Sequence, residues 1–591
     1  MNRAVLLIVP LSAALGACLD VPSGPAPECT QASDCDTANG EICDEGTCYG
    51  NPPHGMYAMV ISPPAERQDL VPRELVMPAI ADDGWIADLS LERPTVFMGR
   101  VEATCVPPNP CDRGAIGATI TITRPSMFKG GPGFKVIADA EASLDSSGPS
   151  FEVALPKTAA YDSQYVVTVI PTGRGDEPQG GSPSAAELYP PMRFALDAKN
   201  NSYTKTILLG GGSLPTIDGT VVGSTGGGLS HYRVVAMGHW EASSPPTEVS
   251  SVDYTGSDGK FHIVLADNLV GTVELIARPA PSAPAAPTLH QQELSATTSS
   301  IRTLVQPANL GNVKAYAFPI RGVDGSGSIN GVRGARVTVS ATLGGAATGQ
   351  TLATFAAEGT ADDNGNVSLM LLDGSGITQQ YRLDVVPPAS SSMGVLFDMP
   401  LSFATMPLLL PTRIAIRGEV DDYLGNPLKD VSVTARPSLR FTWSFPDAPQ
   451  AFVSAIPAAT TLTPETGEFA LWVDPTIATL WGHYDLAFEP ASKARAPSWI
   501  KTDIEIPRDT TVSTVSVDQI RLPDAAAIRG LVIDPDGIEV EGAEVKIFRL
   551  SASLALCTEV LNAPASCPIP ANLQGRGDSD TAGIVRLTLP R

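Results

Sequence analysis

A strand pattern of the form apolar-x-Gly-x-Val recurs along this chain and constrains its fold more than any other feature. Four clear copies occupy residues 97–101, 217–221, 416–420 and 528–532, and a weaker copy begins at Val313. Two further patterns follow each copy in the same order. Self-similarity at a long spacing predicts a tandem array of one structural unit, repeated along the chain.

The second and third patterns are strands that follow glycine-containing turns. The clearest second pattern, residues 425–435, places Val431, Val433 and Ala435 on one face, as a half-buried strand requires. The third pattern is an Asp- or Thr-rich turn followed by an apolar strand, as at residues 465–469. Closing strands that end in proline come next, at residues 165–171, 273–279, 381–387 and 484–490.

The composition also favours strands and turns. The chain holds 54 glycines and 53 prolines, and only 17% of its residues are charged, which is typical of short strands between turns rather than of long helices. We therefore predict an all-β protein with five tandem β-sandwich units, each within the usual size of one domain. The predicted units are residues 95–213, 214–305, 306–412, 413–522 and 523–591.

The order of these patterns resembles that of carboxypeptidase regulatory-like domains, which are transthyretin-like or immunoglobulin-like (Ig-like) sandwiches. The best agreement covers residues 416–490 and 528–589, and the first three units match more loosely. A resemblance of this kind implies an architecture and not an activity.

The two ends of the array do not match each other. The fifth unit lacks a closing strand, whereas residues 57–63 read as a closing strand with no unit before them. We expect residues 56–94 to be N-terminal strands that pack on the first unit, in a rod or string of sandwiches. The alternative is that residues 57–63 complete the exposed edge of a fifth unit, for example in another molecule, by donor-strand addition.

Residues 1–17 have the features of an export leader, which ends in Leu15-Gly16-Ala17 before Cys18. Its apolar run is too short to remain as a membrane span. This start resembles that of bacterial lipoproteins, which implies a diacylglycerol on the Cys18 thiol and a lipidated tether over residues 18–28. Leu19, where aspartate would signal inner-membrane retention, implies transport to the outer membrane. An ordinary secretory leader with a free Cys18 is the alternative.

The other eight cysteines fall into local groups, which leaves Cys18 unpaired, as a lipidated residue would be. An exported chain meets an oxidising compartment, so we predict disulfides rather than zinc, for which no Cys-x-x-Cys knuckle is present. The first group forms a cysteine-rich module at residues 29–50, and three connectivities are possible there. That module resembles the Dickkopf-like segments near the anchor of some surface lipoproteins. The predicted disulfide residues are Cys29, Cys35, Cys43, Cys48, Cys105, Cys111, Cys557 and Cys567.

Motif searches return no hydrolase, metalloprotease or nucleotide-binding signature. We therefore expect no catalytic residues, no cofactor and no metal site. Aspartate-rich turns at residues 362–365 and 534–537 offer oxygen ligands for calcium, but the same residues suit tight turns without any metal.

The fourth unit carries the best clue to a ligand. Phe441 and Trp443 share one strand face by their spacing, and Trp472 lies on the strand face opposite Phe469 and Leu471. A tryptophan turned away from the core can stack on a sugar ring, so these three aromatic residues are candidate ligand-binding residues. Packing in the core or between units is the alternative.

A net charge of −24 excludes nucleic acid as a natural partner. The sequence predicts a membrane-anchored, non-enzymatic surface or envelope lipoprotein that acts as a stalk, adhesin-like protein or scaffold. The alternative is a glycan-binding accessory lipoprotein of a polysaccharide or cell-wall system. The expected partners are the outer membrane, through the N-terminal lipid, and envelope glycans or other surface proteins.

Overall fold

Strands make up nearly all of the regular structure. The computed structural model describes residues 28–55, 57–77, 80–103, 116–125, 134–142, 150–157, 165–172, 187–198, 200, 202–210, 213–241, 246–280, 286–297, 299–323, 327–343, 352–373, 381–401, 407–438, 456, 459–480, 482–491, 495–507, 512–550 and 571–591. Within these ranges the helices are short 3-10 turns, and none is long and apolar enough to span a membrane. The prediction of an all-β chain is confirmed.

The first two units have similar strand sets. Unit one contains β6 (Thr95–Ala103), β7 (Ala118–Pro125), β8 (Phe134–Ala142), β9 (Phe151–Leu155), β10 (Tyr165–Pro171), β11 (Met192–Leu196) and β12 (Ser202–Leu209). Unit two contains β13 (Thr216–Val222), β14 (Tyr232–His239), β15 (Thr247–Glu248), β16 (Asp253–Tyr254), β17 (Lys260–Val264), β18 (Val270–Pro279), β19 (Thr288–Ser295) and β20 (Ser300–Val305).

Units three and four follow the same plan. Unit three contains β21 (Val313–Val323), β22 (Ile329–Gly331), β23 (Arg336–Leu343), β24 (Leu352–Thr360), β25 (Asn366–Leu372), β26 (Arg382–Val386), β27 (Leu396–Pro400) and β28 (Leu408–Leu410). Unit four contains β29 (Ile414–Asp421), β30 (Ser432–Pro437), β31 (Ala459–Leu462), β32 (Glu468–Val473), the 3-10 helix η4 (Pro475–Leu480), β33 (His483–Glu489), β34 (Trp499–Glu505), β35 (Thr514–Ser516) and β36 (Ile520–Arg521).

Each unit is an Ig-like sandwich of two sheets, which confirms the predicted fold class. In unit one the sheets have the strand orders β11-β10-β7-β8 and β12-β6-β9. Unit four repeats this arrangement with β31-β30-β33-β34 and β32-β29-β35. In units one to four the last strand runs parallel to the first, as β12 does to β6, and in unit four β35 does so as well as β36. The other strand pairs in units one and four are antiparallel. The sequence patterns therefore located the first, second, fourth and fifth strands of the unit and missed the third, sixth and seventh.

The recurring glycine has a packing role in the first strand. In units one, two and four it lies opposite a phenylalanine of the fourth strand, as Gly99 does with Phe151. A Cβ on Gly99 would come within 2.0 Å of the Lys205 carbonyl oxygen and 3.0 Å of the Phe151 ring. Unit three reverses the sizes, with Phe318 of β21 opposite Val367 of β25. The pattern at Val313 is weak because in unit three the first strand supplies the phenylalanine that fills the space beside the fourth strand, so no glycine is needed there.

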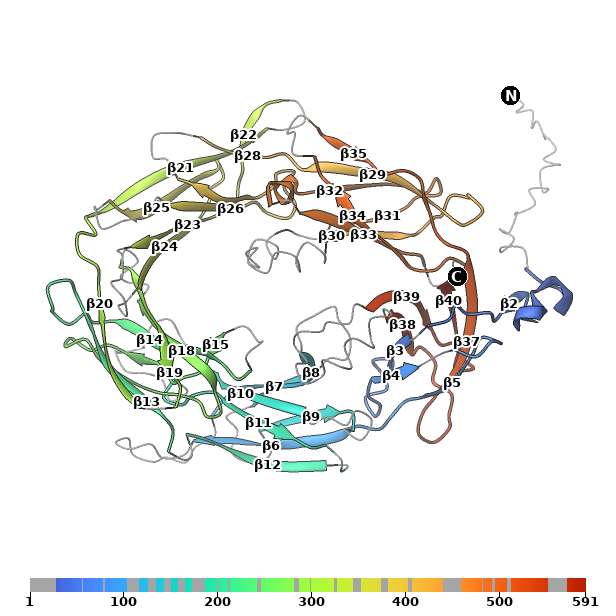
Figure 1. Ribbon diagram of the computed structural model, residues 1–591, viewed down its shortest axis with the longest axis horizontal. Coiled ribbons are helices and arrows are strands. Elements are labelled where there is room, and N and C mark those ends of the chain that lie inside the picture. Colours follow the sequence, from blue (N-terminus) through green and yellow to red (C-terminus); the bar gives the residue numbers. More distant parts are fainter. Residues whose placement is uncertain are drawn as a thin grey trace, which may run out of the picture.

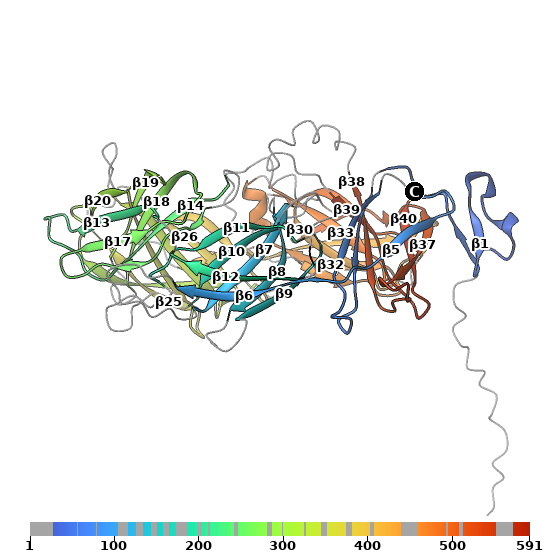
Figure 2. The same ribbon diagram turned by 90° about the horizontal axis from the view of Figure 1, so that it is seen from below.

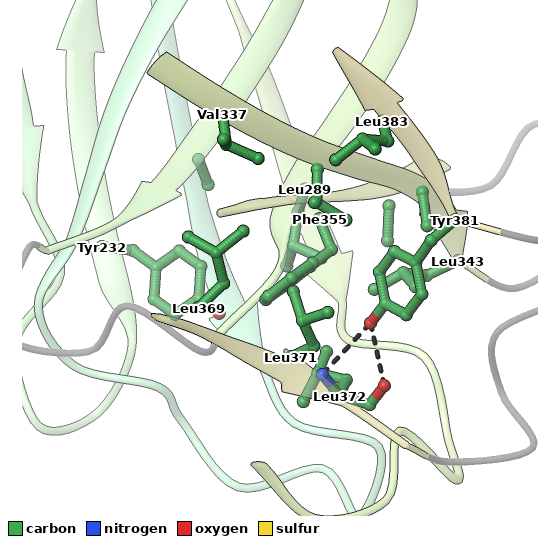
Figure 3. Close-up of a cluster of buried hydrophobic side chains, with 14 of the residues drawn as sticks. Tyr232, Leu289, Val337, Leu343, Phe355, Leu369, Leu371, Leu372, Tyr381 and Leu383 are labelled. Carbon is green, nitrogen blue, oxygen red and sulfur yellow. Dashed lines mark hydrogen bonds between the residues drawn. The ribbon is translucent and has the colours of Figure 1, made fainter. Parts of the chain in front are cut away.

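A tyrosine fastens the start of the fifth strand in units one, three and four. In unit three the Tyr381 hydroxyl donates to the carbonyl of Leu372 at 2.9 Å and accepts from its amide at 3.1 Å, below the buried ring of Phe355 (Figure 3). Burial raises the pKa of Tyr381 to about 12, which reflects how far this hydroxyl is withdrawn from water. Tyr165 and Tyr484 make the corresponding bonds to Pro156 and Asp474.

Units two and three share one sheet. Strand β19 of unit two pairs with β24 of unit three through Leu289 and Ala353, which produces a nine-stranded sheet. One hydrophobic cluster accordingly contains the cores of both units. The predicted boundary near residue 305 therefore separates two sets of strands but not two separate cores.

The junction between units three and four is centred on a buried carboxylate. Asp474 accepts hydrogen bonds from the backbone amides of Val395, at 2.7 Å, and Thr476, at 2.9 Å. The Thr476 hydroxyl donates in turn to the Val395 carbonyl at 2.5 Å. Asp474 is only 2% exposed, and burial raises the pKa of its carboxyl group.

The five sandwiches form a closed ring rather than the expected rod (Figure 1). The sheets that contain the second and fifth strands line the inner side, and the sheets that contain the first strand form the outer side. Seen from below, the ring is a flat belt with the cysteine-rich module projecting at one edge (Figure 2). The expectation of a rod is wrong because the two ends of the array bind each other.

Three N-terminal strands complete the fifth unit and close the ring. The C-terminal segment supplies β37 (Ala525–Ile533), β38 (Glu544–Leu550), β39 (Ala571–Asp578) and β40 (Ile584–Pro590), and the N-terminal segment supplies β3 (Tyr57–Ser62), β4 (Arg73–Met77) and β5 (Trp85–Ser90). Strand β3 pairs antiparallel with β38, β4 pairs with β3, and β5 runs parallel to β37. These three strands occupy the fifth, sixth and seventh positions of the unit.

The expectation that residues 56–94 pack on the first unit is therefore wrong. Their buried side chains, among them Met59 and Leu89, form one cluster with Ile547 and Val585 of the C-terminal segment. The reason is that β38 and β37 each present an unpaired edge, and an edge with free backbone donors and acceptors is satisfied by a matching strand.

Candidate functional site

The cysteine-rich module is held by two crossed disulfides. Cys29 bonds to Cys43 and Cys35 to Cys48, and each bond closes a loop of 14 or 13 residues. Loops of this length contribute about 3 kcal/mol each by restricting the unfolded chain. The module otherwise holds two 3-10 turns, η1 (Ala32–Asp34) and η2 (Thr37–Asn39), and a hairpin of β1 (Ile42–Asp44) and β2 (Thr47–Tyr49). The predicted disulfides are confirmed for these four cysteines, which leaves no thiolate among them for zinc.

Backbone contacts join the module to the edge of the ring. The Gly50 amide donates to the Ala527 carbonyl at 2.9 Å, and the Asn51 amide donates to the Asp82 carbonyl at 2.7 Å. Gly50 has a φ of +124°, and a Cβ there would come within 2.6 Å of the Asp82 oxygen. Gly84 is equally close, since its Cβ would meet the Gly50 nitrogen at 2.8 Å. Only glycine permits this approach, so the module is a built part of unit five.

Three carboxylates of the module, and Glu28 directly before it, face four arginines of units four and five. Glu28 pairs with Arg495 at 3.1 Å and Glu45 with Arg586 at 2.6 Å, and the remaining pairs are Glu41 with Arg591 and Asp44 with Arg529. The arginines come from two units, so the module bridges the seam between them. Because most of these groups are partly exposed, each pair contributes at most about 1 kcal/mol.

Arg529 is the most enclosed of the four arginines. Its guanidinium lies 4.9 Å from the ring centroid of Tyr49 and 5.6 Å from that of Trp85. Burial, and next the charge of Arg586, lower the pKa of Arg529. The module carboxylate of Asp44 offsets that cost directly. Sequence reasoning missed these arginines, because nothing in the local pattern around them shows that they face an acidic module.

A groove of about 620 Å³ remains between the module, unit four and unit five. Its charged lining contains Glu28, Glu41, Arg495, Arg586 and Arg591 from these pairs, together with Asp34 and Asp524, and Tyr49 and Tyr423 lie beside them. These charges are already engaged with one another, so the groove works as a docking seam rather than as a site with a free catalytic group. A second hollow, of about 470 Å³, lies in unit three beside Arg333 and Ser390.

Trp472 is the predicted ligand-binding residue that the structure describes. Its side chain is 51% exposed, whereas Phe469 and Leu471 on the same strand are buried. Ala415 lies directly opposite Trp472, and the exposed Arg417 lies opposite Ala470. Since the core lies between the two layers of the ring, the indole lies on the outer side. The residue directly opposite is a small alanine, and about half of the Trp472 surface is accessible to solvent.

Seven of the predicted site residues lie outside the described residues. Cys18, at the predicted lipid site, belongs to this group, and so do the aromatic candidates and the two remaining cysteine pairs. They are Phe441, Trp443, Cys105, Cys111, Cys557 and Cys567.

The aspartate-rich turns use their carboxylates to hold the turn. Asp534 accepts from the amides of Asp536 and Ile538 at 2.9 and 3.0 Å, and Asp362 does the same with Asn364 and Asn366. The pKa of Asp534 is held below its usual range, first by the Ile538 amide. A turn role therefore accounts for these residues without a calcium ion.

Comparisons with known proteins add little to this geometry. No family model matches the chain, and no curated protein matches it. The shaft pilin SpaA from Lactobacillus rhamnosus GG is similar over 36% of this chain and 97% of its own, with 14% identity and a TM-score of 0.15. A streptococcal ancillary pilin is similar over 52% of this chain and 99% of its own, with 9% identity and a TM-score of 0.17.

A third solved structure, the Bacillus anthracis TIE protein, is similar over 72% of this chain and 74% of its own. Its identity to this chain is 10% and the TM-score is 0.13. With TM-scores this low, none of these likenesses bears on what this chain does.

Proposed function

We propose that this protein is a lipid-anchored, non-enzymatic scaffold of the outer membrane, on the cell surface or its periplasmic side. The observation that carries the proposal is the closure of five sandwiches into a ring by strands from the opposite end of the chain. A linear array bends at its linkers, whereas a closed ring bends only by disturbing buried contacts. The ring is therefore suited to hold other molecules at fixed positions.

The anchor would act close to the ring. If Cys18 carries the lipid, residues 18–28 link it to the module and span at most about 35 Å when fully extended. Three acyl chains supply tens of kcal/mol of membrane affinity, at about 0.8 kcal/mol per buried methylene. Because the module is joined to unit five by backbone bonds, the seam between units four and five would be the part of the ring nearest the membrane.

Membrane fractionation and protease treatment of intact cells test this proposal together. We expect the wild-type chain in the outer-membrane fraction and the Cys18→Ser variant released from it. An unchanged membrane location of Cys18→Ser would contradict lipid anchoring. Digestion of residues 28–591 by a large protease outside unbroken cells would place the ring on the surface. Protection until the outer membrane is opened would place it in the periplasm.

Glycan binding is the second candidate, and the exposed indole of Trp472 favours it. A half-exposed indole offers apolar area on which a sugar ring can stack, and the exposed Arg417 on the neighbouring strand offers hydrogen-bond donors. A glycan array with the soluble chain should give a saturable signal that Trp472→Ala abolishes. Trp499→Ala is the matched control, because that tryptophan is 38% exposed on a sheet of the inner layer. A signal that survives Trp472→Ala would rule out this surface.

A further inference from the structure

We propose that residues 57–91 can complete the fifth unit of a second copy of this chain, so that rings exchange their N-terminal strands and become linked. The partner is a second copy because these strands fit the edges of β38 and β37, and every copy of this chain carries those edges. The proposal concerns self-association and goes beyond the scaffold function. Its test, on purified protein, can fail without affecting the test of membrane anchoring.

The first observation is that the fifth unit is divided between two segments far apart in sequence. Residues 525–590 supply four strands, and residues 57–90 supply the other three. In the described part of the chain, β3 pairs with β38 and β5 pairs with β37, and these are the strand pairings of residues 57–90 outside their own segment. The large, fully buried side chains of residues 57–91 are likewise in the cluster of the C-terminal segment: Tyr57, Met59, Ile61, Ile86, Leu89 and Leu91.

The second observation is the short connection between these strands and the first unit. Leu91 still belongs to the fifth unit, where its amide donates to the Ile533 carbonyl at 2.8 Å. Thr95 already belongs to unit one, where its hydroxyl donates to the Asn200 carbonyl at 2.8 Å. Between them, Arg93 makes an exposed ion pair with Asp536, which is worth little in water. Glu92 still belongs to the N-terminal segment, because its carbonyl accepts from the Val71 amide at 3.0 Å. Residues 93–94 can therefore act as a hinge at small cost.

The third observation is that the interactions broken when the ring opens can form again with the partner. Pairing of β3 with β38, pairing of β5 with β37 and the buried cluster are the same whether the strands come from one chain or from two. The ion pairs and glycine contacts of the cysteine-rich module would form again in the same way. A short linker gives closure within one chain a high effective concentration. Exchange between chains therefore needs a high protein concentration and a step, such as refolding, in which the fifth unit is open.

Two single cysteine variants provide the test. Val60 of β3 lies directly opposite Lys546 of β38, and both side chains are partly exposed. Directly opposed strand residues have the Cα separation that a disulfide requires. Val60→Cys and Lys546→Cys chains are mixed, unfolded with denaturant, refolded together and oxidised. We expect a covalent dimer, with a ratio of dimer to monomer that rises about tenfold for each tenfold increase in protein concentration.

Three controls make the result decisive. Mixtures of each variant with the wild-type chain report any crosslink that involves the native cysteines. A mixture that is never unfolded should remain monomeric. The double variant should form its disulfide within one chain, which shows that both positions can react. The proposal is overturned if the double variant crosslinks while the co-refolded mixture gives no dimer above the wild-type controls.

A second measurement does not depend on any substitution. Wild-type protein refolded at increasing concentration should show a species of twice the monomer mass by light scattering, and dilution should not dissociate it within hours. A single monomeric species at every concentration would also overturn the proposal.

Discussion

Met59 of β3 lies directly opposite Ile547 of β38, and both side chains are fully buried. Residues from the two ends of the chain thus share one core, and the pair joins the N-terminal strands to the fifth unit. The stability of this unit should therefore depend equally on both segments.

Met59→Ala should destabilise the fifth unit by about 2–5 kcal/mol, because it leaves a cavity between two packed sheets. Hydrogen exchange measured by mass spectrometry should show faster exchange in both residues 57–91 and residues 525–590. Met399→Ala, at a methionine that is 45% exposed, is the control and should change little. Faster exchange confined to residues 57–91 would show that the C-terminal strands are stable without them.

Gly50→Ala should weaken the attachment of the module severely, because the new Cβ would collide with the Asp82 carbonyl. The matched control is Gly537→Ala, since Gly537 also has a positive φ, +81°, but has open space around its Cβ position. The control should cost only about 1–2 kcal/mol of backbone strain. Limited proteolysis near residues 51–56 measures the effect. Cleavage of Gly50→Ala that is no faster than that of Gly537→Ala would mean that the close approach at Gly50 does not hold the module in place.

Arg529→Ala should loosen the hairpin of the module, because it removes the ion pair with Asp44 and the ring contacts with Tyr49 and Trp85. The expected loss is about 1–3 kcal/mol, and high salt should reduce it only in part, since ring stacking persists. A double-mutant cycle with Asp44→Ala measures the coupling of the two residues. Additive effects in that cycle would show that the ion pair itself contributes nothing.

Asp474→Asn tests the buried junction between units three and four. The folded-state pKa of Asp474 is raised above its ordinary value of 3.8, so the folded protein binds this proton more tightly than the unfolded chain does. The wild type should therefore gain stability relative to the variant as pH falls from 7 through the folded-state pKa towards about 4. Thermal unfolding of both proteins at a series of pH values measures this. A difference that stays constant with pH would mean that Asp474 is not desolvated.

The same substitution has a second expected effect at neutral pH. An asparagine has one oxygen in place of two, so one of the amides of Val395 and Thr476 would lose its acceptor. An unsatisfied buried amide costs about 1–3 kcal/mol. Asp474→Asn should therefore remain less stable than wild type at pH 7. Equal stability at that pH would mean that removal of the buried charge offsets the lost hydrogen bond.

Much of each sandwich could be predicted because its causes are local. Alternating apolar residues such as Val431 and Val433 determine which strand face is buried, and a turn glycine such as Gly467, at φ +72°, marks where a strand begins. The third, sixth and seventh strands escaped prediction because they lie near sheet edges. Strands such as β11 and β20 each bury a single residue, Leu196 and Leu304, so their alternation is weak.

Local sequence thus determined the all-β class, the repeated unit, the disulfide-bonded module and the outward side of Trp472. Only the tertiary structure decided that the array closes into a ring, that residues 57–90 belong to the last unit and that four arginines face the module. The physical reason is that a strand pattern predicts an edge but not its partner. Which strand meets that edge depends on the angle between each sandwich and the next. Those angles are set by the contacts at the junctions between units.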